Sequence, residues 1–328
     1  MALLVIRLLP SYSNWRETPL IDKQDTSNGM HISKWAGIVG RWSFEGNRAS
    51  YNGPEQPEWP FGICVSNIRL LSGEVRVTVK QSNTDLDTDG RILLGYQSMQ
   101  SDYFTIGLGG HGKAYNVVHW SPSTGWRPLA SAGSEANLPK GEPYEIFVRV
   151  HGQRIILDVN AVRVLEYVLP IPLPLGQVGL FAWGQEGGME FSNMSVMEQR
   201  GDAFVVMQFS GFEELYRDVI EPVTKEFGLR PYRADQKFGP GSIIEDIIQG
   251  IERSQVVIAE ITPANENVFY EVGYAHALKK PTILLAEKDK KLPFDLSGFR
   301  CLFYQNSIGG KRLVEEGLRN HLRAILHE

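Results

Sequence analysis

The spacing of hydrophobic residues changes near residue 200, and this change constrains the fold more than any other feature of the chain. Before about Val196, hydrophobic and polar residues alternate, as in Glu74–Lys80, Tyr144–Val150 and Arg154–Val159. A period of two residues is typical of strands with one buried face, and many such short strands predict an all-β sandwich. All seven tryptophans of the chain also precede residue 200.

After Gly201, short hydrophobic runs alternate with stretches of helical spacing. We expect strands at Ala203–Met207, Gln255–Ile261 and Pro281–Ala286, and helices at Phe212–Phe227, Ser242–Glu252, Val268–Lys279 and Lys311–Leu326. Strand and helix in alternation predict an α/β fold with a flavodoxin-like parallel sheet covered by helices. A chain of 328 residues is long enough for two domains. Their expected bounds are 1–198 and 199–328, on either side of a polar joint.

The charge and the cysteine content indicate which partners and which cellular compartment to expect. The net charge of −5 comes without a block of like charges, so neither a nucleic acid nor a membrane is expected as a partner. The only cysteines, Cys64 and Cys301, lie in different halves, which favours a reducing compartment over a disulfide framework. Arg7 interrupts the hydrophobic opening Met1–Pro10, which we interpret as a strand rather than a signal peptide. We therefore expect a cytoplasmic protein.

Ligands of parallel α/β sheets bind beyond the carboxyl ends of the strands. This rule draws attention to the segments Gln208–Phe212, Asp235–Ser242 and Thr262–Glu271. In the second segment, two glycines precede a predicted helix that Ser242 can cap, so backbone N–H groups there could bind a phosphate. A flexible loop with an ordinary helix cap explains the same residues equally well.

Glu271 is the most informative residue of the C-terminal half. On a helix numbered from Val268, the inward stripe contains Val268, Glu271, Val272 and Ala275, so a carboxylate interrupts a hydrophobic face. Removing an ionised carboxylate from water is costly, so such a residue is paired with a cation, raised in pKa or retained for chemistry. From the spacing alone, a structural ion pair and catalysis are equally acceptable.

Three segments together, Ser254–Thr262, Asn267–Leu278 and Lys280–Leu284, resemble the nucleoside deoxyribosyltransferase family and the bacterial TIR-like domains related to it. The resemblance extends over nearly all of residues 202–328. It implies that the helix glutamate, Glu271 by position, acts at the anomeric carbon of the sugar. The chain departs from the family pattern in two places: Lys279 stands where glycine is usual, and Glu260 ends the strand in place of aspartate.

The resemblance to TIR domains implies cleavage of NAD, with NAD as substrate and no separate cofactor, in bacterial antiviral signalling. A carboxylate can stabilise or capture the oxocarbenium-like carbon that forms when an N-glycosidic bond breaks. Nicotinamide leaves as a neutral molecule, so its departure needs no general acid. Our first hypothesis is therefore an NAD glycohydrolase. The alternatives are a non-enzymatic adaptor that senses a nucleotide, and a base-exchanging nucleoside deoxyribosyltransferase.

Other residues are expected around Glu271. Phe209 and Phe212 are candidates for stacking, Ser242 for phosphate binding, and Asp235 and Asn267 for contacts to ribose or base. Each also has a structural interpretation: Phe212 as a core residue, Asp235 as a turn former and Asn267 as a helix cap. Tyr270 and His276 lie off the inward stripe, and we expect them to be exposed or to contact another subunit, so a homo-oligomer through the TIR-like domains is predicted. No metal site is expected, because His276 has no ligand partner at metal spacing.

The N-terminal half has its own resemblance. Tyr144–Asn160, Gly176–Trp183 and Met189–Val196 are similar in strand pattern to concanavalin-like and laminin-G-like jelly rolls, which implies a carbohydrate or a protein as ligand. Asp85–Gly90 imitates the start of a calcium loop, but Tyr96 stands where a ligating glutamate belongs, so we interpret the segment as a hairpin turn. We expect this half to act as a sensor or assembly module that controls the C-terminal enzyme.

Overall fold

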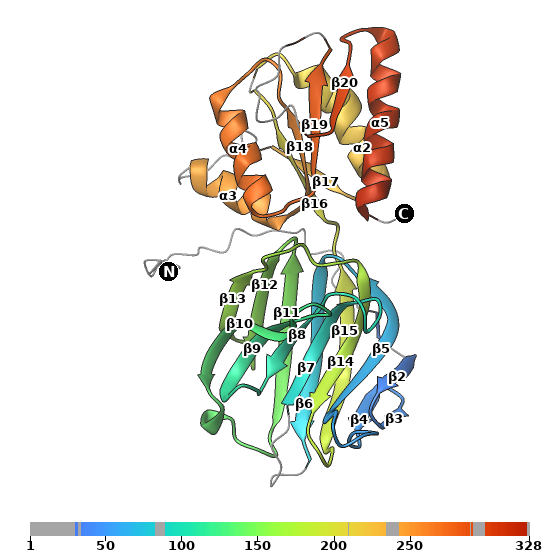
Figure 1. Ribbon diagram of the computed structural model, residues 1–328, viewed down its shortest axis with the longest axis vertical. Helices are drawn as coiled ribbons and strands as arrows, with labels where there is room; N and C mark the ends of the chain where they lie inside the picture. Colours follow the sequence, from blue (N-terminus) through green and yellow to red (C-terminus); the bar gives the residue numbers. More distant parts are fainter. Residues whose placement is uncertain are drawn as a thin grey trace.

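The computed structural model describes residues 30–31, 34–82, 89–208, 210–233, 243–288, 290 and 299–326. Figure 1 shows an all-β part at the bottom of the view and an α/β part at the top. The predicted strand Met1–Pro10 lies outside the described residues.

The all-β part consists of two antiparallel sheets and one short 3₁₀ turn, η1 (Glu135–Asn137). The strands of the eight-stranded sheet are β1 (Met30–His31), β3 (Trp42–Glu45), β4 (Arg48–Tyr51), β6 (Gly73–Gln81), β11 (Pro143–His151), β12 (Arg154–Val159), β13 (Val162–Val168) and β15 (Met189–Glu198). The strands of the seven-stranded sheet are β2 (Trp35–Val39), β5 (Phe61–Leu70), β7 (Asp89–Tyr96), β8 (Tyr103–Leu108), β9 (Lys113–Ser121), β10 (Gly125–Ser134) and β14 (Gly176–Trp183).

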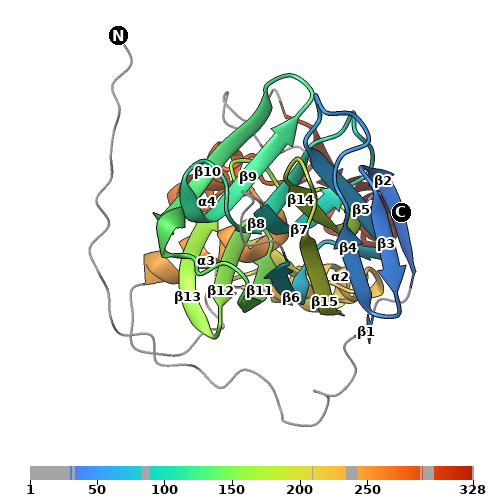
Figure 2. The same cartoon turned by 90° about the horizontal axis from the view of Figure 1, so that it is seen from below.

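The two sheets pack face to face as a sandwich. Their strand orders are β13-β12-β11-β6-β15-β4-β3, with β1 beside β15, and β10-β9-β8-β7-β14-β5-β2. Seen from below, the two sheets form two layers (Figure 2). On β6 the alternate residues Val75, Val77 and Val79 are buried and join the core between the sheets. The predicted β-sandwich is therefore confirmed, and its core follows from the period-two pattern.

The hairpin interpretation of Asp85–Gly90 is wrong. The strand before it, β6, pairs with β11 and β15 in the eight-stranded sheet, whereas the strand after it, β7, pairs with β8 and β14 in the seven-stranded sheet. The segment therefore connects two sheets rather than two paired strands. The calcium-ligand positions Asp85 and Asp87 lie outside the described residues.

The α/β part has five parallel strands in the order β17-β16-β18-β19-β20, which is the flavodoxin-like order 2-1-3-4-5. The strands are β16 (Asp202–Val206), β17 (Arg230–Tyr232), β18 (Ser254–Glu260), β19 (Thr282–Glu287) and β20 (Cys301–Tyr304). The helices are α1 (Glu213–Leu215), the π-helical turn η2 (Tyr216–Ile220), α2 (Glu221–Glu226), α3 (Ile243–Arg253), α4 (Glu266–Ala277) and α5 (Ile308–Leu326). The predicted α/β class is confirmed; the spacing missed the short strands β17 and β20.

Both faces of the parallel sheet are buried. Along β18, Val256 and Ile258 join the core on the side of α2 and α5, and Val257 and Ala259 join the core on the side of α3 and α4. Figure 1 shows α3 and α4 on one side of the sheet and α2 and α5 on the other. Double burial explains why these strands are continuous hydrophobic runs rather than alternating ones.

The turn between β11 and β12 contacts the α/β part. Gln153, which is fully buried, donates its backbone N–H to the carbonyl oxygen of Glu252 (3.1 Å) and its side-chain amide to that of Leu278 (2.8 Å). Gly152 has a φ of +58°, and a Cβ there would lie 2.5 Å from the carbonyl oxygens of Arg253 and Ser254. Only glycine therefore fits this contact.

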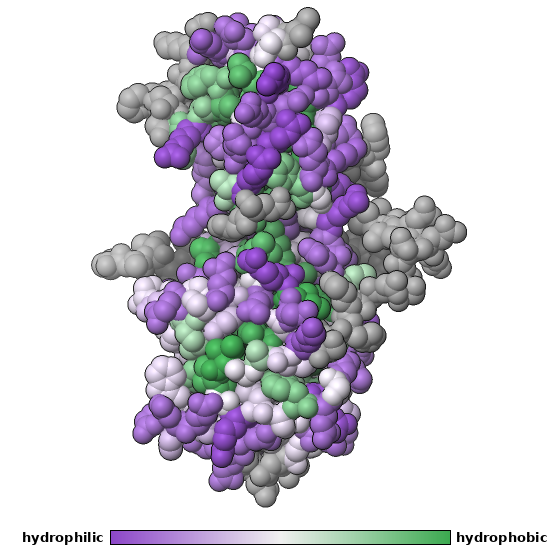
Figure 3. Space-filling model, turned by 90° about the vertical axis from the view of Figure 1, so that its right-hand side faces the viewer, coloured by the Kyte–Doolittle hydropathy of each residue, from purple (hydrophilic) through white to green (hydrophobic). Residues whose placement is uncertain are grey.

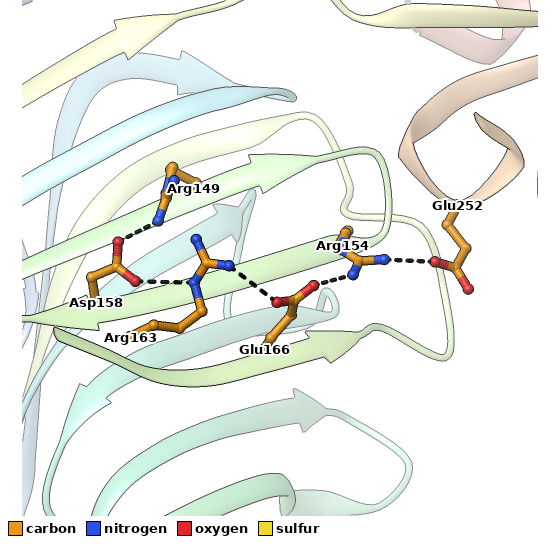
Figure 4. Close-up of polar contacts among 6 residues, drawn as sticks. All are labelled: Arg149, Arg154, Asp158, Arg163, Glu166 and Glu252. Carbon is orange, nitrogen blue, oxygen red and sulfur yellow. Dashed lines mark hydrogen bonds and ion pairs between the residues drawn. The ribbon is translucent and has the colours of Figure 1, made fainter. Parts of the chain in front are cut away.

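Ion pairs also join the two parts, and they extend from there over the eight-stranded sheet (Figure 4). Arg154 donates to the Oε2 atom of Glu252 at 2.9 Å and also pairs with Glu166. The chain of charges runs on through Arg163 to Asp158 and Arg149. From the other side, the hydroxyl group of Tyr274 donates to the Oε1 atom of Glu252 at 3.0 Å. Glu252 thus joins the sandwich to α4.

The outer surface is mixed in character. On the face seen in Figure 3, hydrophobic side chains form separate patches with hydrophilic side chains between them. Of the helices in the described ranges, none combines the length and the apolar character that crossing a membrane requires.

Candidate active site

The carboxyl edge of the parallel sheet carries two buried ionisable groups, Glu260 and Arg233. Glu260 ends β18, Arg233 follows β17, and five residues separate the end of β18 from the start of α4. In a sheet of this order, ligands bind at this edge. The candidate site is therefore built from the ends of β17 and β18 and from the first turns of α4.

Helix α4 places Glu271. Its N-cap is Asn265, whose side-chain oxygen accepts hydrogen bonds from the backbone N–H groups of Asn267 (3.0 Å) and Val268 (3.3 Å). The buried residues of the helix are Val268, Glu271, Val272 and Ala275, which confirms the predicted stripe. Glu271 is 9% exposed, so its carboxyl group belongs to the buried face of the helix.

Glu260 is a second carboxyl group, and it is more deeply buried, at 2% exposure. Its Oε1 atom accepts hydrogen bonds from the backbone N–H (2.8 Å) and the hydroxyl (2.5 Å) of Thr262. Burial raises the pKa of Glu260 to about 7, and the hydrogen bonds from Thr262 and Tyr304 oppose that rise only in part. Near neutral pH this carboxyl group can therefore both hold and release a proton.

The end of β17 brings Arg233 to the same edge. Arg233 is 6% exposed, and its guanidinium lies 5.3 Å from the ring centroid of Tyr216 in the π-helical turn. The hydrophobic pattern of the sequence does not reveal Arg233, because β17 has only three residues and contains a proline. The signal available was an arginine directly after a short Arg-Pro-Tyr run.

The other predicted site residues have different outcomes. Phe209, Asp235 and Ser242 lie outside the described residues. Phe212 is half-buried and packs against the core on the side of α2 and α5, as its structural interpretation requires. Asn267 is exposed in the first turn of α4, and its interpretation as the helix cap is wrong because Asn265 is the cap.

The two residues expected off the inward stripe behave differently from each other. Tyr270 is 54% exposed. His276 is half-buried and stacks on Phe299, with ring centroids 4.4 Å apart. Neither side chain belongs to the buried stripe that contains Glu271. In the described part of the chain, no cluster of three or more His, Cys, Asp or Glu side chains could hold a metal ion.

At position 279 the structure explains why glycine is usual rather than why this chain has lysine. Lys279 follows α4 with a φ of +55°, the left-handed conformation in which glycine commonly ends helices. Lys280, 4% exposed, donates from Nζ to the carbonyl oxygens of Glu252 (2.9 Å) and Ser254 (2.7 Å). Burial lowers the pKa of Lys280 to about 7, against the opposing effect of Glu252. Both lysines lie at the far edge of the sheet from Glu260, and the hydrogen bonds of Lys280 give that residue a structural role.

Comparison with known proteins supports the C-terminal assignment at the level of the family. Residues 202–320 match the family model described as nucleoside 2-deoxyribosyltransferase. The match covers the deoxyribosyltransferase side of the resemblance, and the TIR-like side remains a prediction. A search of curated proteins found no match to this chain.

Solved structures similar to the chain correspond to about half of its length. A carbohydrate binding module from Bacillus subtilis is 11% identical, with a TM-score of 0.42, covering 50% of this chain and 96% of that one. A Bacillus subtilis protein with a galectin-like fold is 10% identical, with a TM-score of 0.40, covering 50% and 89%. A galectin from Caenorhabditis elegans is 15% identical, with a TM-score of 0.32, covering 46% and 96%. The strand pairing by itself defines the two sheets of the sandwich.

Proposed function

We propose that the α/β part breaks the N-glycosidic bond of a nucleoside, with Glu271 as the group that acts at the anomeric carbon. The observation that carries this proposal is a carboxylate at 9% exposure on α4, inside the segment that matches the nucleoside 2-deoxyribosyltransferase model. A buried carboxylate beside the sugar opposes the positive charge that develops there.

The proposed reaction has two steps. A carboxylate oxygen of Glu271 bonds to C1′ of the sugar while the C1′–N bond breaks and the base leaves with the electron pair. A ring nitrogen of a second base, or a water molecule, then attacks C1′, loses its proton and releases Glu271. The acceptor decides whether the outcome is base exchange or hydrolysis.

The leaving group decides whether an acid is needed. A purine or pyrimidine leaves as an anion unless it receives a proton, whereas nicotinamide leaves NAD as a neutral molecule. Glu260, with its pKa raised to about 7, can donate a proton near neutral pH, and it lies at the carboxyl edge of the sheet. This favours a nucleoside over NAD. Hydrolysis of NAD remains our second candidate, because neutral nicotinamide leaves without an acid and the reaction would then need Glu271 alone.

One assay separates these candidates and the adaptor alternative. The purified protein is incubated with a deoxynucleoside and a different free base, and separately with NAD, and the products are followed by liquid chromatography. We expect base exchange or base release, lowered at least about 100-fold in Glu271→Gln and unchanged in the control Glu266→Gln, an exposed glutamate of the same helix. Full turnover by Glu271→Gln would refute the assignment, and inertness of the wild type toward every substrate would support an adaptor.

Control by the sandwich belongs to the same proposal. Gln153 and Arg154 of the sandwich contact Leu278, at the end of α4, and Glu252, which Tyr274 of α4 also contacts. Occupancy of the sandwich by a ligand could therefore alter the position of the helix that carries Glu271. Assembly of several chains through the α/β parts, with exposed Tyr270 at the contact, is the second proposed means of control.

A further inference from the structure

A groove runs between the sandwich and the α/β part, and we call it the joint groove. It consists of two adjoining cavities of about 250 and 330 Å³, which share the lining residues Leu71, Leu175, Gln255 and Leu326. The first two belong to the sandwich, whereas Gln255 begins β18 with Ser254 and Leu326 ends α5. Figure 1 shows this end of α5 facing the sandwich. The joint groove is thus at the opposite edge of the parallel sheet from the candidate active site.

A proline-rich loop of the sandwich forms one wall of the joint groove. The loop joins β13 to β14 and reads Leu-Pro-Ile-Pro-Leu-Pro-Leu from Leu169 to Leu175, and its residues 172–175 line the groove. Each proline has a fixed φ and lacks a backbone N–H, so this wall is stiff and poor in hydrogen-bond donors.

Hydrogen bonds fix both ends of this loop. The backbone N–H of Leu169 donates to the carbonyl oxygen of Gln153 (2.8 Å), and the side-chain amide of Gln153 donates back to that of Leu169 (3.0 Å). At the other end, Arg69 (3.1 Å) and Gln97 (3.0 Å) donate to the carbonyl oxygen of Leu175. The wall is therefore formed before any ligand binds, which lowers the entropic cost of binding.

The wall on the α/β side is also apolar. Ile325 near the end of α5 lines the first cavity, and Phe227 and Leu229 line the second. The second cavity also has two exposed charged residues of opposite sign, Glu198 and Arg200. The joint groove is therefore an apolar channel whose exposed charges lie at the second cavity.

Lys280 brings a buried positive charge to the first cavity. Lys280 is 4% exposed and lines this cavity together with Ser254, whose carbonyl oxygen accepts a hydrogen bond from Nζ at 2.7 Å. The carbonyl oxygen of Glu252 accepts a second hydrogen bond at 2.9 Å. An ammonium group has three N–H donors, so one donor is left after the two bonds that Lys280 makes within the described residues.

Within the described residues, no carboxylate pairs with this ammonium group. The carboxylate of Glu252 acts on it only from a distance, because its Oε2 atom pairs with Arg154 and its Oε1 atom accepts from Tyr274. Lys280 therefore meets neutral carbonyl dipoles, and burial lowers its pKa to about 7. A buried charge is costly unless an opposite charge pairs with it, so a carboxylate on a ligand would supply the missing partner.

We propose that the joint groove binds a linear aliphatic carboxylate, with the carboxylate at Lys280 and the hydrocarbon chain between the proline-rich loop and the end of α5. One remaining N–H matches a singly charged group, whereas a phosphate has three acceptor oxygens and nearly two charges to satisfy. Two cavities in a row suit an extended chain. A ligand of roughly ten non-hydrogen atoms is expected to bind with a dissociation constant between about 10 μM and 1 mM.

The proposal does not depend on the reaction at Glu271, and it has a structural consequence. The walls of the joint groove come from both parts, so a bound chain contacts the sandwich and the α/β part at once. Binding to the folded chain alone stabilises the arrangement that forms the groove.

Calorimetric titration of the full chain at pH 7 tests the proposal. The carboxylate probes are butanoate, hexanoate and octanoate, and the matched probes of the same length as octanoate are octan-1-ol, octylammonium and octyl phosphate. We expect octanoate to bind, with affinity rising by up to about fourfold for each methylene group along the series. Octan-1-ol and octylammonium should bind at least about tenfold more weakly, because neither can pair with the ammonium group of Lys280.

Three variants separate the charge from the apolar walls. Lys280→Met removes the charge, so octanoate should bind at least about tenfold more weakly while octan-1-ol binds as before, which shows that the groove is intact. Leu175→Asn changes a half-buried wall residue and leaves Lys280 in place, so it should weaken both probes at least about tenfold. Leu313→Asn, at an exposed leucine of α5 outside the groove, is the control and should bind as the wild type does.

Four results would overturn the proposal. They are the absence of octanoate binding, binding of octan-1-ol or octylammonium as tight as that of octanoate, tighter binding of octyl phosphate, and wild-type affinity for octanoate in both groove variants. If Lys280→Met does not fold, Leu175→Asn and the comparison of octanoate with octan-1-ol still decide the result.

Discussion

Replacing Glu260 with glutamine should make the stability of the α/β part less dependent on pH. Burial raises the pKa of Glu260 from 4.5 to about 7 in the folded chain. Below about pH 4.5 the carboxyl group is protonated in both the folded and the unfolded chain, so it adds no cost. As the pH rises to about 7 and above, folding must bury a charge, and the folded state is progressively disfavoured.

The size of this effect follows from the two pKa values. Each factor of ten in proton affinity corresponds to about 1.4 kcal/mol, so a pKa change from 4.5 to about 7 corresponds to about 3 kcal/mol at alkaline pH. Glutamine keeps the shape, and its carbonyl oxygen can accept the hydrogen bonds that Thr262 donates to the Oε1 atom. The free energy of unfolding of Glu260→Gln minus that of the wild type should therefore be about 2–3 kcal/mol larger at pH 8 than at pH 5.

The chain allows the two parts to be observed separately in urea titrations. Within the part of the chain that the structure describes, the α-helices all lie between residues 213 and 326, so circular dichroism at 222 nm follows the α/β part. All seven tryptophans precede residue 200, so tryptophan fluorescence follows the sandwich. The gain should appear in the dichroism transition. If the free-energy difference between Glu260→Gln and the wild type is the same at pH 5 and pH 8, the pKa of Glu260 is not raised and its use as a proton donor fails as well.

Three further predictions test other parts of the structure. Lys279→Gly should stabilise the α/β part by about 1 kcal/mol, because Lys279 has a φ of +55°; an unchanged urea midpoint in the dichroism signal would contradict this. Gly152→Val should lower the free energy of unfolding by at least about 2 kcal/mol, because its Cβ would meet two carbonyl oxygens at 2.5 Å in the contact between the two parts. The melting temperature should fall accordingly. If activity needs assembly, turnover per milligram should rise with protein concentration and Tyr270→Asp should abolish the rise; constant turnover on dilution, with monomers by sedimentation, would exclude it.

The sequence predicted the elements whose pattern is long enough to show a period. The buried stripe of α4 and the valines of β6 follow directly from periods of 3.6 and two residues. The strands β17 and β20 have three and four residues, too few for a period, and β17 contains Pro231. Without β17, the sequence does not place Arg233 at the carboxyl edge of the sheet. Without β20, it does not place Tyr304, which donates a hydrogen bond to Glu260, beside that residue.

Sequence patterns also do not show which residues of distant strands lie together in one site. A cavity on the outer face of the seven-stranded sheet is lined by Arg91 on β7, His111 after β8 and Trp183 on β14, which only strand pairing brings together. Alternation shows that a residue faces outward, but it does not show which outward residues are neighbours. The raised pKa of Glu260 has the same origin, since its burial depends on the packing of several strands and not on its position in the chain.

The contact between the sandwich and α4 lies close to Glu271 in the helix, although it is formed at the opposite edge of the sheet from Glu260. Tyr274, which contacts Glu252, is three residues beyond Glu271, so the Cα atoms of the two residues are about 4.5 Å apart along the helix axis. Backbone atoms this close in one helix move together, so a shift of Glu252 that moves the backbone at Tyr274 would also move the backbone at Glu271, whereas rotation of the tyrosine side chain alone would not. The proposed control of Glu271 through the Arg154–Glu252 ion pair therefore requires that α4 itself moves.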